Sequence, residues 1–359
     1  MFPTLRRRLP ALAALLVVPA VVVATPGVAD AAQTRNRADA AAGWLGRQLA
    51  DDQLIHVEFN GQSYADYGLT ADTVLALDAA KVGRRAATRA TRALKRHVLD
   101  YTGGGVKSEF YAGPFAKLLL VAAAHGQDPR AFGTSARSDL VAELQALECG
   151  TRFRPDCAAA DDGRFGDISQ WSDFSNTLTQ SLALIALDRT SPRGPSRDAV
   201  QFLAGQQCRD GSFPESFGAQ TCTGSVDATG FAIQALVRTG GKASLERASR
   251  AGRWLARQQN RNGSLEGNGV RNANSTALAA QAFDVLDRAK KARKARAFLT
   301  SLQLRCGADR ADRGLVRYDR GGDGDPVRAT AQAVPALART VLADISKDGS
   351  SRPLPRLAC

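Results

Sequence analysis

The stretches AVQFLAGQQCRDGSF (Ala199–Phe213) and AGRWLARQQNRNGSL (Ala251–Leu265) carry the same pattern of residues. In each, a helix-like segment with an aromatic-Leu pair ends in Gln-Gln, and a turn of the form Gly-Ser-apolar follows. The helix ending recurs in WLGRQ (Trp44–Gln48) and FLTSLQ (Phe298–Gln303). Internal repetition of this kind predicts an array of similar helical hairpins.

A second helix-like segment, small and apolar, follows each connector. Five of these segments have a Thr seven residues before their last large apolar residue: Thr70, Thr177, Thr229, Thr276 and Thr330. Weaker members of the array are PFAKLLLVAAA (Pro114–Ala124) and DLVAELQALE (Asp139–Glu148).

These segments predict an all-α fold of about twelve helices in six hairpins. No period-2 run of strand length stands out. The second helix of each hairpin, apolar on most sides, is expected to lie inside a ring, and the Arg-rich first helix outside. The expected architecture is a closed α/α toroid (a six-hairpin α/α barrel), with an open stack of hairpins as the alternative.

The repeat resembles the one shared by prenyltransferases and squalene cyclases (the prenyltransferase/squalene oxidase repeat), in which an aromatic-Leu helix ends in Gln before a Gly-x-aromatic turn. The resemblance is strong over residues 199–286 and continues more weakly over residues 40–345. It implies a terpenoid cyclase-like toroid with a cavity at the inner-helix ends. At fold level the chain also resembles the helical barrel of cobalamin carriers and the thioester domains of complement.

The N-terminus has the order of an export signal. Arg6, Arg7 and Arg8 precede an apolar run from about Leu12 to Val23, and small residues at Ala29 and Ala31 suit signal peptidase. A retained membrane anchor is the alternative, as is twin-arginine instead of general export. We expect a secreted or extracytoplasmic protein with no transmembrane anchor after cleavage. The expected division is residues 1–31 signal peptide, 32–345 toroid and 346–359 C-terminal tail tied back by Cys359.

Six cysteines in an exported chain indicate three disulfides, although the sequence allows 15 connectivities. We expect neighbours to pair, with the last bridge holding the tail: Cys149–Cys157, Cys208–Cys222 and Cys306–Cys359. No metal or cofactor is expected, because there is no C-x-x-C and the three His lack ligand spacing. Two Asp/Gly loops, residues 161–167 and 318–325, leave calcium open as an alternative.

The formal net charge is +13, from 48 Lys and Arg against 35 Asp and Glu. The basic residues cluster in Arg84–His97 and Arg288–Arg296, at spacings that place them on solvated helix faces. Nucleic-acid binding is disfavoured because no aromatic platforms or recognised module accompany these charges. For an exported basic protein, anionic cell-wall polymers or lipid headgroups are more plausible partners than nucleic acid. The favoured interpretation is that these Arg and Lys side chains only solvate the outer helix faces.

Asp227 is the candidate catalytic residue. Squalene cyclases have D-x-D-D-T at the start of an inner helix. The matching stretch here is Ser225-Val226-Asp227-Ala228-Thr229, in which only the middle Asp of the three is kept. The resemblance implies that this Asp is the acid that protonates a substrate. The alternative is that Asp227 caps its helix. Ser175 and Asn274 lie at the matching position of two other repeats, also two residues before the recurrent Thr, and both are residue types that cap helices. The zinc ligands of protein prenyltransferases are absent, and so is the Cys-Gly-Glu-Gln of complement thioesters.

The inner-helix starts and the connectors before them would form a rim that binds a ligand. Its candidate residues are Tyr64, Asp66, Tyr67, Asp72, Trp171, Asp173, Asn272 and Asp325, together with Asp227. Polar residues expected to face the ring interior are Asp72, Lys117, Gln234, Gln281 and Gln332.

Three functions follow from this reading of the sequence. The first is a secreted, non-catalytic binding protein for an apolar ligand such as an isoprenoid or lipid, for a wall-derived ligand, or for a protein. The second is a toroid enzyme, terpene cyclase-like or a lyase or glycosidase, with Asp227 as its acid. The third is a structural envelope protein without a ligand.

Overall fold

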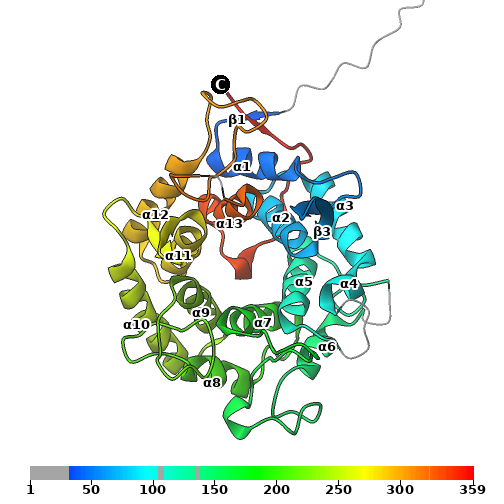
Figure 1. Cartoon of the computed structure of the whole chain (residues 1–359), viewed down its shortest axis with the longest axis vertical. Helices are drawn as coiled ribbons and strands as arrows, with labels where there is room; N and C mark the ends of the chain where they lie inside the picture. Colours follow the sequence, from blue (N-terminus) through cyan, green and yellow to red (C-terminus); the bar gives the residue numbers. More distant parts are fainter. Residues whose placement is uncertain (1–31, 104–108, 135–137, 323) are drawn as a thin grey trace, which may run out of the picture. The chain divides into compact units, whose positions relative to one another are not determined.

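The computed structural model describes residues 32–103, 109–134, 138–322 and 324–359, and within them helices alternate between an inner and an outer ring (Figure 1). The inner helices are α2 (Tyr67–Ala80), α5 (Ala112–His125), α7 (Thr177–Thr190), α9 (Val226–Thr239), α11 (Ala273–Val285) and α13 (Pro326–Ala338). Each packs against the next, and α13 packs back against α2. The ring is therefore closed, which confirms the predicted α/α toroid and excludes the open stack.

The outer helices precede their inner partners along the chain. They are α1 (Arg37–Gly46), α3 (Arg84–Arg96), α6 (Leu140–Ala146), α8 (Arg197–Gly205), α10 (Lys242–Gln258) and α12 (Ala289–Leu302). These twelve helices form the six predicted hairpins. The short helix α4 (Val98–Thr102) is additional, and two 3-10 turns lie at Ala159–Asp161 and Leu342–Asp344. The predicted signal peptide at residues 1–31 lies outside the described residues, and none of the described helices has the length and apolar run needed to cross a membrane.

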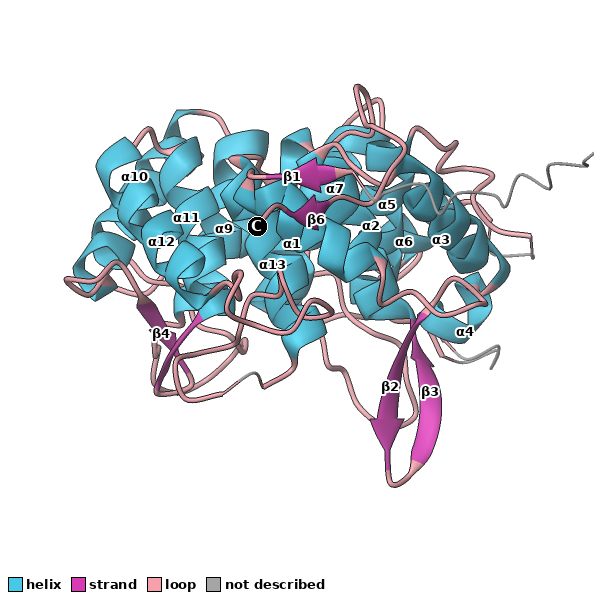
Figure 2. Ribbon diagram, turned by 90° about the horizontal axis from the view of Figure 1, so that it is seen from above, coloured by secondary structure: helices cyan, strands magenta, loops and turns pink. Residues whose placement is uncertain are grey.

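The fold is mostly helical as predicted, but the sequence analysis missed a few short strands. Strands β2 (Ile55–Phe59) and β3 (Gln62–Asp66) form an antiparallel hairpin that projects from one side of the ring (Figure 2). Asn60 and Gly61 join them with φ of 51° and 74°. Asn-Gly with both φ positive forms the type I′ turn that suits a two-residue hairpin loop. This turn therefore specifies a β-hairpin within an otherwise helical chain.

Two smaller sheets complete the strand content of the described residues. Strands β4 (Leu265–Gly267) and β5 (Val270–Asn272) form a second hairpin before α11. Strand β1 (Gln33–Thr34) pairs in parallel with β6 (Arg356–Leu357), which joins the two ends of the toroid chain.

Gln side chains at the ends of the outer helices tie neighbouring hairpins together. Nε2 of Gln207 donates to the carbonyl oxygens of Gly211 (3.0 Å) and Arg247 (2.9 Å), so it joins its own connector to α10. Gln259 makes the same pair of bonds to Gly263 and Lys291 on α12. The predicted role of Gln in bonding the loop backbone is confirmed, and each Gln also reaches the next outer helix.

We call this pair of bonds from one Gln amide the Gln clamp, and the same clamp at Gln303 closes the ring. Nε2 of Gln303 donates to Gly314 O (3.1 Å) and to Arg37 O (2.9 Å) on the first outer helix. Gly314 has φ of +105°, and a Cβ there would lie 2.4 Å from Ala40 O. Glycine is therefore required both by its backbone conformation and by the close approach of α1.

The recurrent Thr residues anchor the same connectors from the inner ring. Thr70, Thr229, Thr276 and Thr330 each accept a hydrogen bond at Oγ1, from the backbone N–H of Ile55, Phe213, Leu265 and Val316 respectively. In the third hairpin Thr177 does not do so. Gln180 takes over instead, accepting from Phe165 N (2.9 Å) and donating to the carbonyl oxygens of Gly163 and Ala199.

The three disulfides join the expected neighbours: Cys149–Cys157, Cys208–Cys222 and Cys306–Cys359. The last bridge holds a C-terminal strap that crosses the start of α3. Gly83 N donates to Pro353 O (2.8 Å) and Arg84 N to Ser351 O (2.9 Å). The strap therefore covers the place where the first hairpin lacks a clamp, since Gln48 bonds only to Trp44 of its own helix.

We predict that Gln303→Ala lowers the free energy of unfolding by about 2–4 kcal/mol, because two hydrogen bonds are lost and two backbone carbonyls are left without that donor. Gln48→Ala is the matched control, since Gln48 makes no bond to another helix, and it should cost under about 1 kcal/mol. Urea denaturation of both variants measures the difference. Equal losses would show that the Gln303 clamp does not hold the ring.

Replacing both Cys306 and Cys359 by Ser should lower the free energy of unfolding more than replacing Cys149 and Cys157. In the chain-entropy model the first pair, with a sequence separation of 53, contributes about 4 kcal/mol, and the second, with a separation of 8, about 2.5 kcal/mol. Thermal and urea unfolding of the two double variants tests the order. The reverse order would mean that the strap adds little to the stability of the folded ring.

Candidate functional site

The ring has two unlike faces. The connectors that run from an outer to an inner helix meet at the inner-helix N-termini, and we call this side the mouth face. At the opposite side, residues 340–345 turn into the ring and pack against α7 and α9. Arg189 donates to Leu342 O (3.0 Å) and Ile345 O (2.5 Å), and Leu342 N donates to Gln234 Oε1. This plug closes the ring from behind.

A cavity of about 230 Å³ lies between the inner helices in front of the plug. Its apolar lining includes Leu75, Leu120, Leu178, Leu182, Phe231, Leu278, Pro335 and Leu342. Leu342 comes from the plug, so the cavity has an apolar floor. The inner helices leave this space because their facing side chains are small or medium in size.

Charged groups lie on the wall of the same cavity. Nζ of Lys117 contacts both carboxylate oxygens of Asp72, at 2.9 and 3.0 Å, across α2 and α5. Although burial alone lowers it, the Asp72 carboxylate raises the pKa of Lys117 above its ordinary value, so the ammonium stays charged. Burial raises the pKa of the neighbouring Tyr101 to about 12, so its hydroxyl stays neutral.

Arg328 adds a second cation to this lining from the first turn of α13. Its guanidinium lies 3.2 Å from Asp325 and 3.8 Å from Asp66. The sequence analysis missed Arg328, although its place three residues after a cap at the start of an inner helix was a usable signal. The structure thus brings Asp66, Asp72 and Asp325 together around Arg328 and Lys117.

Asp227 lies in a different pocket. It lines a groove of about 530 Å³ at the start of α9, together with Glu215 and Glu266 from the connectors before α9 and α11. Burial raises the pKa of Asp227, the charge of Glu215 raises it further, and the Ser275 hydroxyl partly offsets the shift. Among the described residues neither Asp227 Oδ1 nor Ser275 Oγ has a hydrogen-bond partner of normal geometry.

The helix-cap interpretation of Asp227 is wrong. Ser225 caps α9 by accepting from Ala228 N, and Asp227 lies inside the first turn. In α11 the cap likewise lies two residues before the expected one, at Asn272 and not Asn274, whereas in α7 it lies one residue after it, at Asn176 and not Ser175. The Ser225 hydroxyl thus accepts one of the exposed N–H groups at the helix start, and the Asp227 side chain lines the groove.

The other predicted rim residues have several different roles. Asp66, Asn272 and Asp325 are helix caps, each accepting a backbone N–H at 2.7–2.9 Å. Tyr67 stacks on His97, with ring centroids 5.2 Å apart. Tyr64 and Trp171 are exposed side chains on the mouth face, and Trp171 is 75% exposed. Asp66, Tyr67, Asn272 and Asp325 therefore each have a contact within the protein, and ligand binding by the eight residues stays a prediction.

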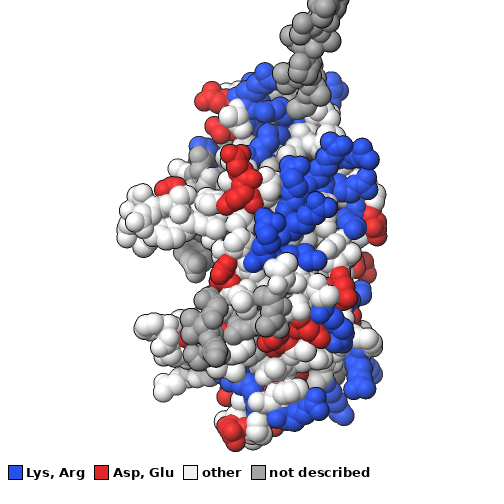
Figure 3. All heavy atoms as spheres, turned by 90° about the vertical axis from the view of Figure 1, so that its right-hand side faces the viewer, with Lys and Arg blue, Asp and Glu red and all other residues white. Residues whose placement is uncertain are grey.

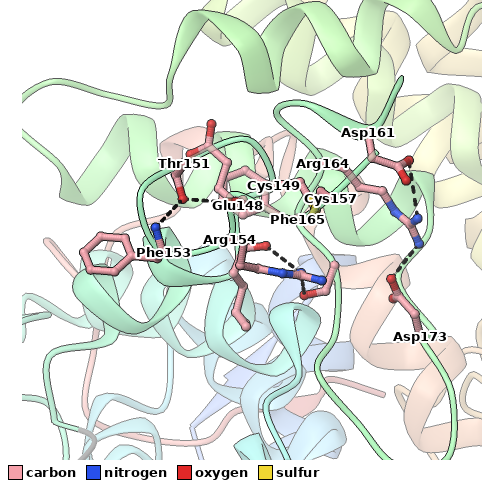
Figure 4. Close-up of a disulfide and its surroundings, with 12 residues drawn as sticks. Glu148, Cys149, Thr151, Phe153, Arg154, Cys157, Asp161, Arg164, Phe165 and Asp173 are labelled. Carbon is pink, nitrogen blue, oxygen red and sulfur yellow. Dashed lines mark hydrogen bonds and ion pairs between the residues drawn. A yellow bond between two sulfur atoms is a disulfide. The ribbon is translucent and has the colours of Figure 1, made fainter. Parts of the chain in front are cut away.

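The acidic loop at residues 161–167 is satisfied by the protein itself (Figure 4). Arg164 bridges Asp161 (3.5 Å) and Asp173 (2.7 Å), beside the Cys149–Cys157 disulfide. The Asp167 carboxylate accepts from Ala112 N and Phe174 N. Asp319 of the second loop accepts from two backbone N–H groups, and Asp323 lies outside the described residues. No group of three potential ligands for a metal gathers anywhere in the described part of the chain.

Large apolar side chains are exposed mainly around the mouth. The structure exposes eight of them: Phe59, Tyr64, Phe153, Ile168, Trp171, Phe174, Leu245 and Val270. All except Leu245, which lies on α10, belong to outer-to-inner connectors and so to the mouth face. None of the eight lines the central cavity, so the seven on the connectors are exposed around it.

Comparison with known proteins identifies the fold. Neither a family model nor a curated protein matches the sequence. Among solved structures the chain is similar to the type II terpene cyclase MstE from Scytonema, at 16% identity and a TM-score of 0.60 over 85% of this chain and 97% of that one. It is equally similar to an unsaturated glucuronyl hydrolase specific for heparin, at 14% identity and 0.60, over 85% and 96%.

A third similar structure is ent-copalyl diphosphate synthase from Streptomyces platensis, at 20% identity and a TM-score of 0.50 over 76% of this chain and 50% of that one. The neighbours thus include two unlike classes of enzyme on one toroid. The structural similarity establishes the terpenoid cyclase-like fold. Because the sequence identities are this low, it does not establish the activity, which has to be argued from the site.

We predict that Asp227→Asn stabilises the protein at neutral pH. Because burial raises the folded-state pKa of Asp227, ionisation costs stability as pH rises from the ordinary value of 3.8 through the raised value. The gain of the variant over the native protein should therefore be absent at acidic pH, grow through that window and then stay constant. Urea denaturation across the pH range measures it, and a difference that does not vary with pH would contradict the raised pKa.

Proposed function

We propose that this protein binds the apolar end of an amphiphilic ligand in its central cavity. The observation that carries the proposal is the closed-bottomed apolar cavity with Lys117, Asp72 and Arg328 on its wall. Ligand sites typically combine an apolar lining with a few placed polar groups that fix orientation. An apolar chain would lie against the Leu residues, and a polar head would meet the charged groups.

The size of the cavity limits the ligand. An engineered cavity of about 150 Å³ in another protein holds benzene, so a space of 230 Å³ takes a somewhat larger apolar group. This corresponds to the end of a chain, such as one or two isoprene units, and not to a whole long lipid. The remainder of a longer ligand would extend past the mouth, where exposed aromatic side chains lie.

An isoprenoid or lipid is the ligand class that we favour. Solved complexes of the similar MstE contain geranylgeranyl dihydroxybenzoate as substrate and merosterolic acid A as product. We also propose that the chain is a member of the prenyltransferase/squalene oxidase repeat family and acts outside the cytoplasm, as its three disulfides suggest.

Binding without cyclisation is supported by the contents of the cavity. Asp227 does not line it, so a proton donor at that position faces another pocket. Phe231 is the one aromatic residue in the described lining, and Phe115 and Phe283 are fully buried in the core. Carbocation chemistry needs several aromatic faces around the reacting chain.

A second candidate function rests on the groove. A buried carboxyl with a raised pKa, beside two further carboxylates, suits general acid catalysis on a polar substrate such as a saccharide. In this proposal Asp227 donates the proton and Glu215 or Glu266 activates water. Loss of hydrolysis or elimination in Asp227→Asn, with cavity binding unchanged, would support it.

The cavity proposal predicts that Ala331→Trp reduces binding of geraniol, a ten-carbon isoprenoid alcohol, at least about tenfold, because an indole would occupy much of the 230 Å³. Ala243→Trp is the matched control, since Ala243 is exposed on α10. Titration calorimetry measures both variants. Equal affinity of the native protein and the Ala331 variant would place the ligand outside the cavity, and no heat from any of them would count against an apolar ligand.

A further inference from the structure

The excess of basic over acidic residues comes from three outer helices. Together α3, α10 and α12 carry 16 Lys and Arg and one acidic residue, Glu246. The rest of the chain carries the remaining 32 basic and 34 acidic residues, a formal charge of −2. The positive net charge therefore comes from these three helices, which we call the basic arc; α10 and α12 are neighbours, and α1 separates α12 from α3 (Figure 1).

The cations of the basic arc are largely unneutralised. In the described residues Arg296 of α12 has an acidic partner, Asp284 at 2.6 Å, and no cation of α3 or α10 has an ion pair. Most of these side chains are exposed to solvent. On the side of the molecule where α3 lies, Lys and Arg form a continuous band (Figure 3).

The charges are also held close together. Helices α10 and α12 lie side by side, because Lys291 Nζ donates to Ala256 O (2.6 Å) and Gln259 of α10 donates to Lys291 O (3.0 Å). Burial, followed by the charges of Lys294 and Arg288, lowers the pKa of Lys291. Such mutual repulsion favours a counterion that neutralises several cations at once.

The shape and composition of the basic arc favour a flexible polyanion over a nucleic acid. The outer helices form a convex wall (Figure 1), and duplex DNA, with a persistence length of about 50 nm, is too stiff to follow it beyond one or two helices. Trp254 and Phe298, the aromatic residues of α10 and α12, are buried, so no stacking platform for bases accompanies the charges. A flexible chain can follow the wall and contact successive helices.

The side chains favour phosphate groups. Eleven of the 16 cations are Arg, whose planar fork pairs with two oxygens of a phosphate at once. We propose that the basic arc binds a flexible phosphodiester polymer, such as a chain of glycerol phosphates in a cell envelope. The interaction is independent of the central cavity, and it would hold the protein at a phosphate-rich surface with the mouth face free.

The test measures binding of purified poly(glycerol phosphate) to the purified protein by calorimetry at several salt concentrations. The arc variant replaces Lys242, Arg253, Lys290, Arg293 and Lys294 by Gln, all exposed, and leaves Arg250 in place because it donates to Gln207. The matched control replaces five exposed Arg outside the arc by Gln: Arg35, Arg152, Arg193, Arg209 and Arg310. Both variants lose the same charge, at different locations, and circular dichroism checks that both fold.

The arc variant should bind the polymer at least about tenfold more weakly than the native protein at low salt. A plot of log affinity against log salt concentration should have a slope smaller in magnitude by up to about 4, because each of the five lost phosphate contacts contributes roughly 0.7–0.9 to that slope. The control should stay within about twofold of the native protein. Ala331→Trp should bind the polymer normally, which separates this result from failure of the cavity proposal.

Several results would overturn the inference. Equal weakening in both five-residue variants would show that net charge alone attracts the polymer. Tighter binding of a DNA duplex of the same charge would assign the arc to nucleic acid, and tighter binding of vesicles of phosphatidylglycerol would assign it to a membrane surface. Equal affinity for hyaluronate, which carries carboxylates, would remove the preference for phosphate.

Discussion

Four of the six junctions between hairpins depend on one side-chain interaction, a Gln amide (Gln180, Gln207, Gln259 or Gln303) that donates to two backbone carbonyls at once. One carbonyl belongs to the connector of its own hairpin and the other to the next outer helix, as for Gln259 with Gly263 and Lys291. Without such a bond the connector carbonyl would be buried with no donor, which is unfavourable. Because Gln303 makes the bond to Arg37, the same local interaction that spaces the hairpins also joins the last to the first.

The clamp explains where the site is able to form. It holds the connectors against the outer wall, so the inner helices need no large side chains to fill the ring and leave a cavity at its axis. The plug around Leu342 then seals one end, and the connectors define the other. The candidate binding site is thus the space left when six hairpins are spaced by their backbone contacts. Its charged lining, Lys117 with Asp72 and Arg328, bridges three neighbouring inner helices.

The sequence predicted the parts of this arrangement that are local and repeated. The Gln endings, the Thr column, the six hairpins and the neighbour pairing of cysteines are present as expected, because each is set by residues close in the chain. The β2–β3 hairpin was missed although Asn60-Gly61 signals it. The cap at Asp227 was wrong by two residues, since helix starts are the least certain boundaries in a sequence. Whether rim residues converge depends on ring geometry, which sequence spacing does not contain.

The separation of cavity from groove is the step that decides between the candidate functions. In a cyclase the acid and the apolar chain must share one space, because the proton is delivered to the hydrocarbon. Here Leu178 lines both pockets and stands between them, whereas Asp227 opens only to the groove. The fold therefore carries an apolar site without its acid and an acid without an apolar site. Either proposed function, isoprenoid binding in the cavity or proton donation in the groove, needs only one of these pockets, and a reaction that used both would require Leu178 to move.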